Sequence, residues 1–397
     1  MTPLRAQFDR VQIIALIAGV VGLALAGIGA FLHPDPRQFF FSYLFAFLFW
    51  VGLPLGSLCV LMIHYLTGGG WGYTIRRFLE ASISTLPLMA LLFVPIFFGL
   101  RHLYPWARPE IAAHDDALQK VHLYLNLPVY AVRMAVCFGL WIVAAFMLNR
   151  WSAQQDKTAD PALTRRIRTF CGPGLLGFVL TVSLATVDWI MVLERNWYST
   201  VFPALLIIGQ ILLTFAFCAV MLAWVTGPAP FDREANPISG VVRVEHFHSL
   251  GNFLLAFVMM WAYLTVSQLI IIWSGNEPRE ISWYLHRTVG AWKYVGIFLG
   301  LFNFGLPFCL LLSRENKQNV RLLTVLAVGI CGAHAVERYW QVMPSLHRDG
   351  LSVSWLDVAA LIGIGGVWTA AFLARLKTRL TLPQNDPRME PALVHGH

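Results

Sequence analysis

The chain has 397 residues, of which 57% are hydrophobic and only 13% charged, and its net charge is +8. Soluble globular domains contain about 25% charged residues, so this composition excludes an ordinary soluble domain. The basic residues lie between apolar runs rather than on one solvated face, which argues against nucleic-acid binding. We therefore predict an all-α integral membrane protein embedded in a lipid bilayer.

Ten apolar runs are each long enough to cross a bilayer, which takes about 20 helical residues. The first begins like a signal peptide, but its length favours a retained helix over a cleaved signal. The polar connections are too short to fold independently. We therefore expect a single polytopic membrane domain over 1–397, in which 377–397 form a cytoplasmic tail. The predicted spans are Val11–Phe31, Phe41–His64, Ala81–Leu100, Pro128–Leu148, Phe170–Val192, Thr200–Val225, Leu250–Trp273, Gly290–Leu312, Val320–Trp340 and Trp355–Leu376.

The distribution of Lys and Arg predicts the orientation of these spans. If the N-terminus is inside, the inner segments hold 18 of these residues and the outer segments hold 10, while Arg133 lies within a span. Cytoplasmic segments are enriched in Lys and Arg. Both termini are therefore predicted to be cytoplasmic.

The six cysteines fall in or beside apolar runs, and none forms a C-x-x-C or C-x-x-C-H motif. We expect them to pack as small buried side chains. A haem b would need two histidines at equal depth on facing helices. His64 and His248 lie at span ends, and His334 has no histidine at its depth. We thus predict no metal site, and any iron–sulfur cluster or haem would belong to a partner.

Ionisable residues within apolar spans are costly, so each is a candidate functional residue. In the predicted topology, one set converges towards the outer membrane surface, where it could relay protons. Alternatively, Arg133 and Asp188 form a purely structural ion pair, or Arg133 bonds to neighbours in its own helix. The outer set is Arg133, Asp188, His122, Glu194, Tyr198, His334 and Glu337.

A second polar set gathers near the inner surface, and neutral polar residues lie between the two levels. With bound water, such a ladder could carry protons across the membrane. Arg76 and Arg77, next to Glu80, have the alternative role of setting the topology. The predicted proton path consists of His64, Tyr65, Ser57, Tyr263, Ser267, Gln268, His248 and Glu80.

Several stretches together resemble a known family over about residues 10–375. They are Phe41–Trp50 with His64–Gly68, Tyr124–Pro128 with Arg133, Asp188–Met191 through Glu194 to Trp197–Thr200, Leu254–Phe257 with Trp261–Tyr263, Trp273–Asn276, and Trp283–Arg287. The chain resembles the smaller of two NrfD/polysulfide-reductase-type membrane subunits of bacterial alternative complex III, a quinol:cytochrome c oxidoreductase.

This resemblance implies ten helices, eight of them in two four-helix bundles, in the bacterial inner membrane. It implies a subunit without its own redox centre that lines a quinol site, a proton-conducting path, or both. The implied partners are a larger homologous membrane subunit, a periplasmic iron–sulfur subunit, and multihaem and monohaem cytochrome c subunits. These partners would carry the haems and iron–sulfur centres.

Two other functions remain open at this stage. The chain could be a non-catalytic anchor for redox partners, in which case its buried polar groups could be replaced without loss of turnover. It could also be a secondary transporter. Transporters typically have broken helices that arise from inverted repeats, and the sequence has no evident repeat of this kind.

Overall fold

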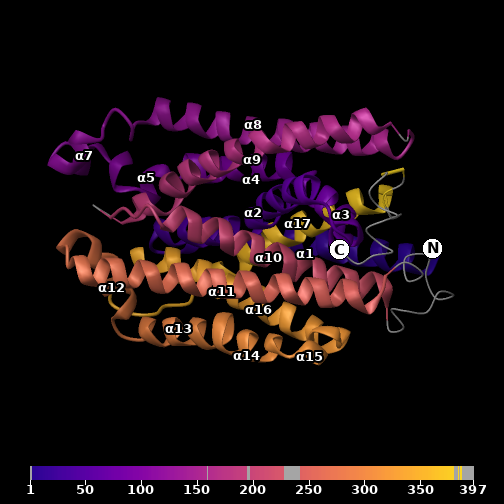
Figure 1. Cartoon of the computed structure of the whole chain (residues 1–397). Helices are drawn as coiled ribbons and strands as arrows, with labels where there is room; N and C mark the ends of the chain where they lie inside the picture. Colours follow the sequence, from indigo (N-terminus) through magenta and orange to yellow (C-terminus); the bar gives the residue numbers. More distant parts are fainter. Residues whose placement is uncertain are drawn as a thin grey trace.

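The computed structural model describes residues 2–158, 160–194, 197–227, 242–379, 383, 385 and 386. Every regular element in these ranges is a helix, which confirms the predicted all-α class. Most of the predicted C-terminal tail lies outside the described residues. The long helices run side by side (Figure 1). They are α1 (Thr2–Leu32), α2 (Pro36–Thr67), α3 (Gly70–Ile83), α4 (Leu86–Phe98), α8 (Leu127–Gln155), α9 (Pro161–Trp189), α10 (Phe202–Thr226), α11 (Val244–Gly275), α16 (Val320–Val342) and α17 (Trp355–Leu376).

Shorter helices complete the described part of the chain. One long segment is continuous but changes its winding, from α13 (Trp292–Leu299) through the π-helix η3 (Gly300–Gly305) to α14 (Leu306–Leu312). Within the described ranges, nine helices are long and apolar enough to cross a membrane, and the bent pair α3–α4 makes a tenth if it is counted as one span. The remaining short α-helices are α5 (Leu100–Leu103), α6 (Pro109–Ala112), α7 (Asp116–Lys120), α12 (Pro278–Thr288) and α15 (Arg314–Gln318). Four single 3-10 turns are η1 (Pro105–Ala107), η2 (Met191–Leu193), η4 (Met343–Ser345) and η5 (Lys377–Arg379).

The long helices form two groups. The helix α2 belongs to the first group and lies in the interior, since 94% of the residues in its most apolar stretch are buried. The first group consists of α2, α4, α8 and α9, which contact one another. The second consists of α10, α11, α16 and the segment α13–η3–α14. The helices α1 and α17 pack together against α2. This grouping corresponds to the two four-helix bundles that the resemblance implies.

The two ends of the bundle differ in what they contain (Figure 1). One end carries α7 and α12, and we call it the distal end. At the other, the proximal end, an ion pair between Asp9 and Lys377 joins the start of α1 to the residue after α17. The first and last long helices therefore place their outer termini at the same end.

Local sequence explains where several long helices begin. Asp35, Asn126 and Asp160 each lie just before a helix and accept a hydrogen bond from a backbone N–H of its first turn, at 2.8–2.9 Å. Each is followed by a proline within the first two helical positions. A side-chain acceptor and a proline suit a helix start because the first N–H groups have no partner within the helix.

The predicted span Ala81–Leu100 is divided between α3 and α4, whose axes meet at 42°. Pro87 lies in the first turn of α4, and a proline has no N–H to continue the hydrogen bonding of a preceding helix. The Thr85 hydroxyl donates to the Ser82 carbonyl and accepts the Trp368 indole N–H at 2.9 Å. This hydrogen bond therefore joins the bend between α3 and α4 to α17.

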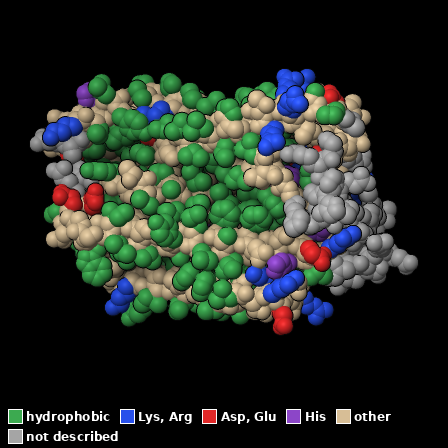
Figure 2. Space-filling view, viewed as in Figure 1, with side chains coloured by type: hydrophobic (Ala, Val, Ile, Leu, Met, Phe, Trp, Pro, Cys, Tyr) green, Lys and Arg blue, Asp and Glu red, His purple; other side chains and the backbone are tan. Residues whose placement is uncertain are grey.

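The surface between the two ends is apolar. Figure 2 shows hydrophobic side chains over the middle of the visible face and charged side chains mainly near its ends. On α8, Val132, Val136, Leu140 and Val143 recur every three or four positions and are 51–62% exposed. Such a stripe is compatible with lipid tails, because hydrocarbon imposes no cost on exposed apolar side chains.

Candidate functional site

The ion pair between Arg133 and Asp188 joins α8 to α9. The Arg133 Nε and Nη2 each donate to one carboxylate oxygen of Asp188 at 2.8 Å. A third nitrogen donates to the Tyr124 carbonyl at 2.7 Å, and the guanidinium lies 3.7 Å from the centroid of the Tyr124 ring. Asp188 is fully buried. A two-pronged contact of this kind fixes both side chains and neutralises a buried charge.

Glu194 lies in a separate cluster at the distal end. Its carboxylate is 3.2 Å from His286 Nδ1 and 3.4 Å from Arg287 Nη1, and it accepts a hydrogen bond from Ser345 at 3.0 Å. Burial lowers the pKa of the Arg287 guanidinium to about 10, although the Glu194 charge opposes this shift. Arg287 thus remains charged at neutral pH and connects α12 to the loop after α9.

The predicted outer relay is therefore divided among different clusters. His122 is exposed, and its Nδ1 lies 2.8 Å from the Gln119 carbonyl oxygen. Tyr198 is 65% exposed. A cavity of about 360 Å³ is lined by both Tyr124 and Glu194, and Tyr198 also borders it. The cluster of Arg133 and Asp188, through Tyr124, and the cluster of Glu194 therefore border the same cavity.

The third cluster surrounds Glu337 on α16. One oxygen of its carboxylate accepts hydrogen bonds from Trp261 Nε1 at 2.9 Å and from Gln341 Nε2 at 3.2 Å. The other oxygen lies 2.8 Å from His334 Nδ1. Arg338 Nη2 lies 2.9 Å from His334 Nε2, and its Nη1 donates to Gln341 at 2.5 Å. All five side chains are at most 5% exposed, so this is a continuous polar network inside the bundle.

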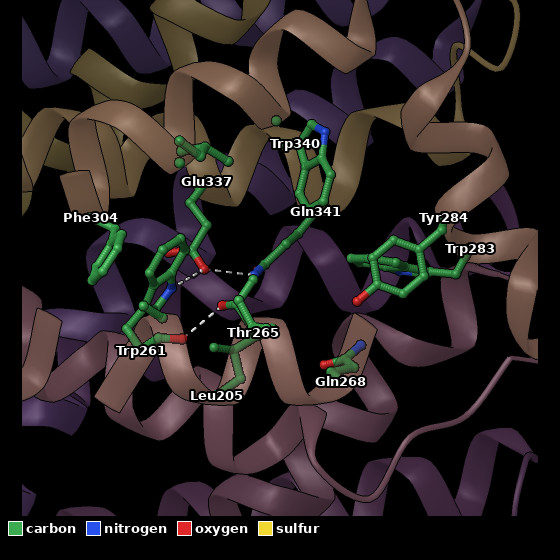
Figure 3. A pocket seen from close by; sticks show the side chains of 15 residues that line it. Leu205, Trp261, Thr265, Gln268, Trp283, Tyr284, Phe304, Glu337, Trp340 and Gln341 are labelled. Atoms are coloured by element: carbon green, nitrogen blue, oxygen red, sulfur yellow. Dashed lines mark hydrogen bonds between the residues drawn. The ribbon is translucent and has the colours of Figure 1, made fainter. Parts of the chain in front are cut away.

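The Glu337 cluster opens onto a cavity of about 170 Å³ between α11, α12, α13 and α16. Figure 3 shows aromatic rings on several sides of it, with Glu337 and Gln341 on one side and Gln268 on α11. The π-helix η3 contributes Gly300 and Phe304, and π-helical turns within α-helices occur frequently at functional sites. The aromatic lining residues are Trp261, Trp283, Tyr284, Phe304 and Trp340.

Two polar groups face this cavity without a partner among the described residues. Neither amide atom of Gln268 is hydrogen-bonded, although the residue is only 2% exposed, and the Trp340 indole N–H is also unpaired. A buried polar group without a partner costs about 1–3 kcal/mol. The lining residue Val266 is 52% exposed, so the cavity borders the apolar outer face of α11. A ligand with polar atoms and an apolar body would suit this arrangement.

The inner polar set forms a network at the proximal end. Glu80 accepts hydrogen bonds from Arg76 Nε at 2.9 Å, from Arg77 Nη1 at 2.7 Å and from the Ser152 hydroxyl at 2.5 Å. Arg76 also lies 3.1 Å from Asp386. The two arginines are therefore buried and paired, and they connect α3 to α8 in addition to any effect on topology.

The neutral residues of the predicted proton path divide into interior and surface positions. Ser57, Tyr65 and Gln268 are at most 2% exposed, and so is His64 at the end of α2. Tyr263 is instead 67% exposed, because it lies on the opposite face of α11 from Trp261 and Gln268. It therefore lies outside any buried path through this chain. His248 and Ser267 are half-buried.

Sequence reasoning missed several residues of these clusters. Arg338 lies inside α16 and is only 1% exposed, although it is two residues from the predicted span end at Trp340. Gln341 was overlooked, although it follows Glu337 and Arg338 at helical spacings of four and three. Asp357 was also missed, and it accepts a hydrogen bond from the Ser42 hydroxyl at 2.5 Å. Arg338 and Asp357 are charged and each lies two residues inside a predicted span end, and this position is the signal that could have identified them.

Fold and surface together define a multi-pass α-helical membrane protein with buried ionisable clusters. No protein-family profile matches the chain, and a search of curated proteins found no significant match. Among the described residues, no three His, Cys, Asp or Glu side chains gather as a metal ion would require.

Proposed function

We propose that this chain is a membrane subunit of a respiratory quinol:electron-acceptor oxidoreductase of the alternative complex III type. In this proposal, the aromatic cavity beside Glu337 takes a quinol ring, and the cluster around Glu337 takes up a proton from it. One observation carries the proposal: a buried carboxylate and two unpaired polar groups border an aromatic cavity next to the lipid-facing surface.

The size and chemistry of the cavity support a ring-shaped ligand. A cavity of about 150 Å³ can hold one benzene ring, and this one has about 170 Å³. The Gln268 amide and the Trp340 N–H would pair with the ring oxygens. An isoprenoid tail would leave past Val266 into the bilayer, because that side of the cavity borders the apolar surface.

Oxidation of a quinol releases two electrons and two protons. Glu337 would accept one proton on its carboxylate, and the other would leave to solvent. Arg338 can only donate to His334 Nε2, so the neutral imidazole carries its proton on Nδ1, 2.8 Å from Glu337, and would orient this carboxylate. The electrons would go to iron–sulfur and haem centres of partner subunits. We further propose a bacterial inner-membrane location with both termini cytoplasmic.

Two variants test the cavity. Glu337→Gln keeps the volume of the side chain but removes the proton-accepting charge. It should lower quinol turnover by about 100-fold, as expected for loss of a general base. A β-carbon on Gly300 would meet no atom within 4 Å, so Gly300→Leu should fill the cavity and raise KM. Gly329→Leu is the matched control, because Gly329 is an exposed position on α16 with equally open space.

The outcomes separate the proposal from its alternatives. If Glu337→Gln and Gly300→Leu both assemble and keep full turnover, the cavity is not a quinol site. If substitutions of Asp188, Glu194 and Glu337, one from each cluster, also leave turnover intact, the chain is an anchor for its partners. Gentle purification should recover haem-containing and iron–sulfur subunits with the chain. A colourless, partner-free protein with transport activity would instead favour a transporter.

A further inference from the structure

A groove of about 650 Å³ lies between the end of α8 and the start of α9, at the proximal end. Its floor includes Met147, Trp151 and Phe170, and its rim includes Arg165 and Arg166. Trp151 is held in place by an edge-to-face contact with Phe170, with ring centroids 5.2 Å apart. The groove therefore has an apolar floor and a cationic rim.

The cationic rim is part of a wider basic region. Arg165 and Arg166 are exposed, as are Arg150 and Arg168 on the same helices. The Arg166 guanidinium lies 5.0 Å from the centroid of the Trp151 ring, which positions it over the groove. Figure 2 shows basic side chains near this end of α8 and α9.

The acidic residues nearest in sequence do not neutralise this rim. Asp156 receives two hydrogen bonds from Arg77, at 2.7 and 2.8 Å. Asp160 accepts a hydrogen bond from the Ala162 N–H at the start of α9. Asp156 is thus paired with another arginine, and the charge of Asp160 is outnumbered by the four exposed arginines of the region. The rim keeps a positive field that an anion could complement.

The apolar floor continues along both helices towards the middle of the bundle. Val143 and Phe146 on α8 are 53% and 63% exposed, and Leu176 on α9 is 64% exposed. A ligand bound at the rim would therefore have an apolar surface beside it, of a kind that a free anion cannot use.

We propose that this groove binds an acidic glycerophospholipid, with its phosphate against Arg165 and Arg166 and an acyl chain along α8 and α9. A guanidinium presents paired N–H donors that match phosphate oxygens. Basic pockets between membrane helices bind anionic headgroups in the same way. A zwitterionic lipid binds less well, because its own cation is repelled by the rim.

The test uses the full-length chain with its accompanying subunits, reconstituted in nanodiscs of phosphatidylcholine that contain a small fraction of fluorescent phosphatidylglycerol. Arg165→Gln combined with Arg166→Gln should weaken binding of the labelled lipid by about tenfold to thirtyfold, since each basic residue near a membrane surface contributes about a factor of five. The matched control is Arg150→Gln combined with Arg168→Gln, which removes the same charge outside the groove.

Selective loss in the groove variant supports the proposal, provided that the melting temperature of that variant in detergent without acidic lipid is unchanged, because the loss is then not caused by misfolding. Equal loss in both double variants would overturn it, because it would show a general charge effect. Equal affinity for labelled phosphatidylcholine would also overturn it. Full displacement of the labelled lipid by millimolar inorganic phosphate would identify a free-anion site instead.

Discussion

The ion pair between Arg133 and Asp188 allows its structural role to be separated from a role in proton transfer. Asp188→Asn keeps the shape of the side chain but replaces one acceptor oxygen by a donor. Arg133 would lose about half of its contact with residue 188 and keep the Tyr124 carbonyl and ring. Hydrogen bonds to charged groups contribute about 1.5–3 kcal/mol each, so the expected destabilisation is about 2 kcal/mol.

Arg133→Leu should cost more, because it leaves a carboxylate with no exposed surface without its charged partner. Breaking a buried ion pair from one side typically costs about 3–5 kcal/mol. The double variant Arg133→Leu, Asp188→Leu removes both charges and should recover much of this loss. Unfolding in mixed micelles would measure the three stabilities, and size-exclusion chromatography would measure assembly.

Turnover then decides the functional question. We predict that Asp188→Asn assembles but is impaired in quinol oxidation or proton coupling, whereas Arg133→Leu is also impaired in assembly. An Asp188→Asn complex with full turnover and coupling would show that the pair is structural only. If Arg133→Leu were as stable as the unmodified chain, the argument from the buried carboxylate would be refuted.

Three further predictions concern topology, packing and pH. Periplasmic reporter activity should be absent after Leu376 and present in the loop 101–126, and the reverse result would exclude cytoplasmic termini. Gly366→Ala should lower the melting temperature, since its β-carbon would collide with the α1 backbone, whereas Gly329→Ala should not. Burial lowers the pKa of His347 below its usual 6.5, so acidification protonates the unfolded chain first. The melting temperature should therefore fall as the pH drops through about 6.5, and His347→Gln should show a smaller fall.

Much of the architecture was accessible from the sequence alone. Apolar runs of about 20 residues predict membrane helices, because the backbone of a spanning segment must satisfy its own hydrogen bonds. Asp35, Asn126 and Asp160 with their following prolines likewise identify helix starts from local chemistry. A pairing of Arg133 with Asp188 was one of the alternatives that the sequence offered, because their predicted spans place both at a similar depth, and the structure shows this pair.

Hydropathy could not give the direction in which each side chain points. It places a residue at a depth along a span, but the neighbours of a helix determine which of its faces are buried. Tyr263 and Gln268 are both on α11, yet one is 67% exposed and the other 2%. His334 and Glu194 were expected at similar depth to Asp188, and the structure gives each of them different partners.

The candidate cavity also depends on tertiary structure. It lies among α11, α12, α13, η3 and α16, and two glycines, Gly296 and Gly300, contribute backbone rather than side chains to its wall. Nothing in a linear sequence shows that these glycines face Trp261 and Glu337. The sequence determined that the chain consists mainly of long apolar helices and which ionisable residues lie within them. The packing of those helices determined which charges share a site, because contacts between distant segments arise only when the chain folds.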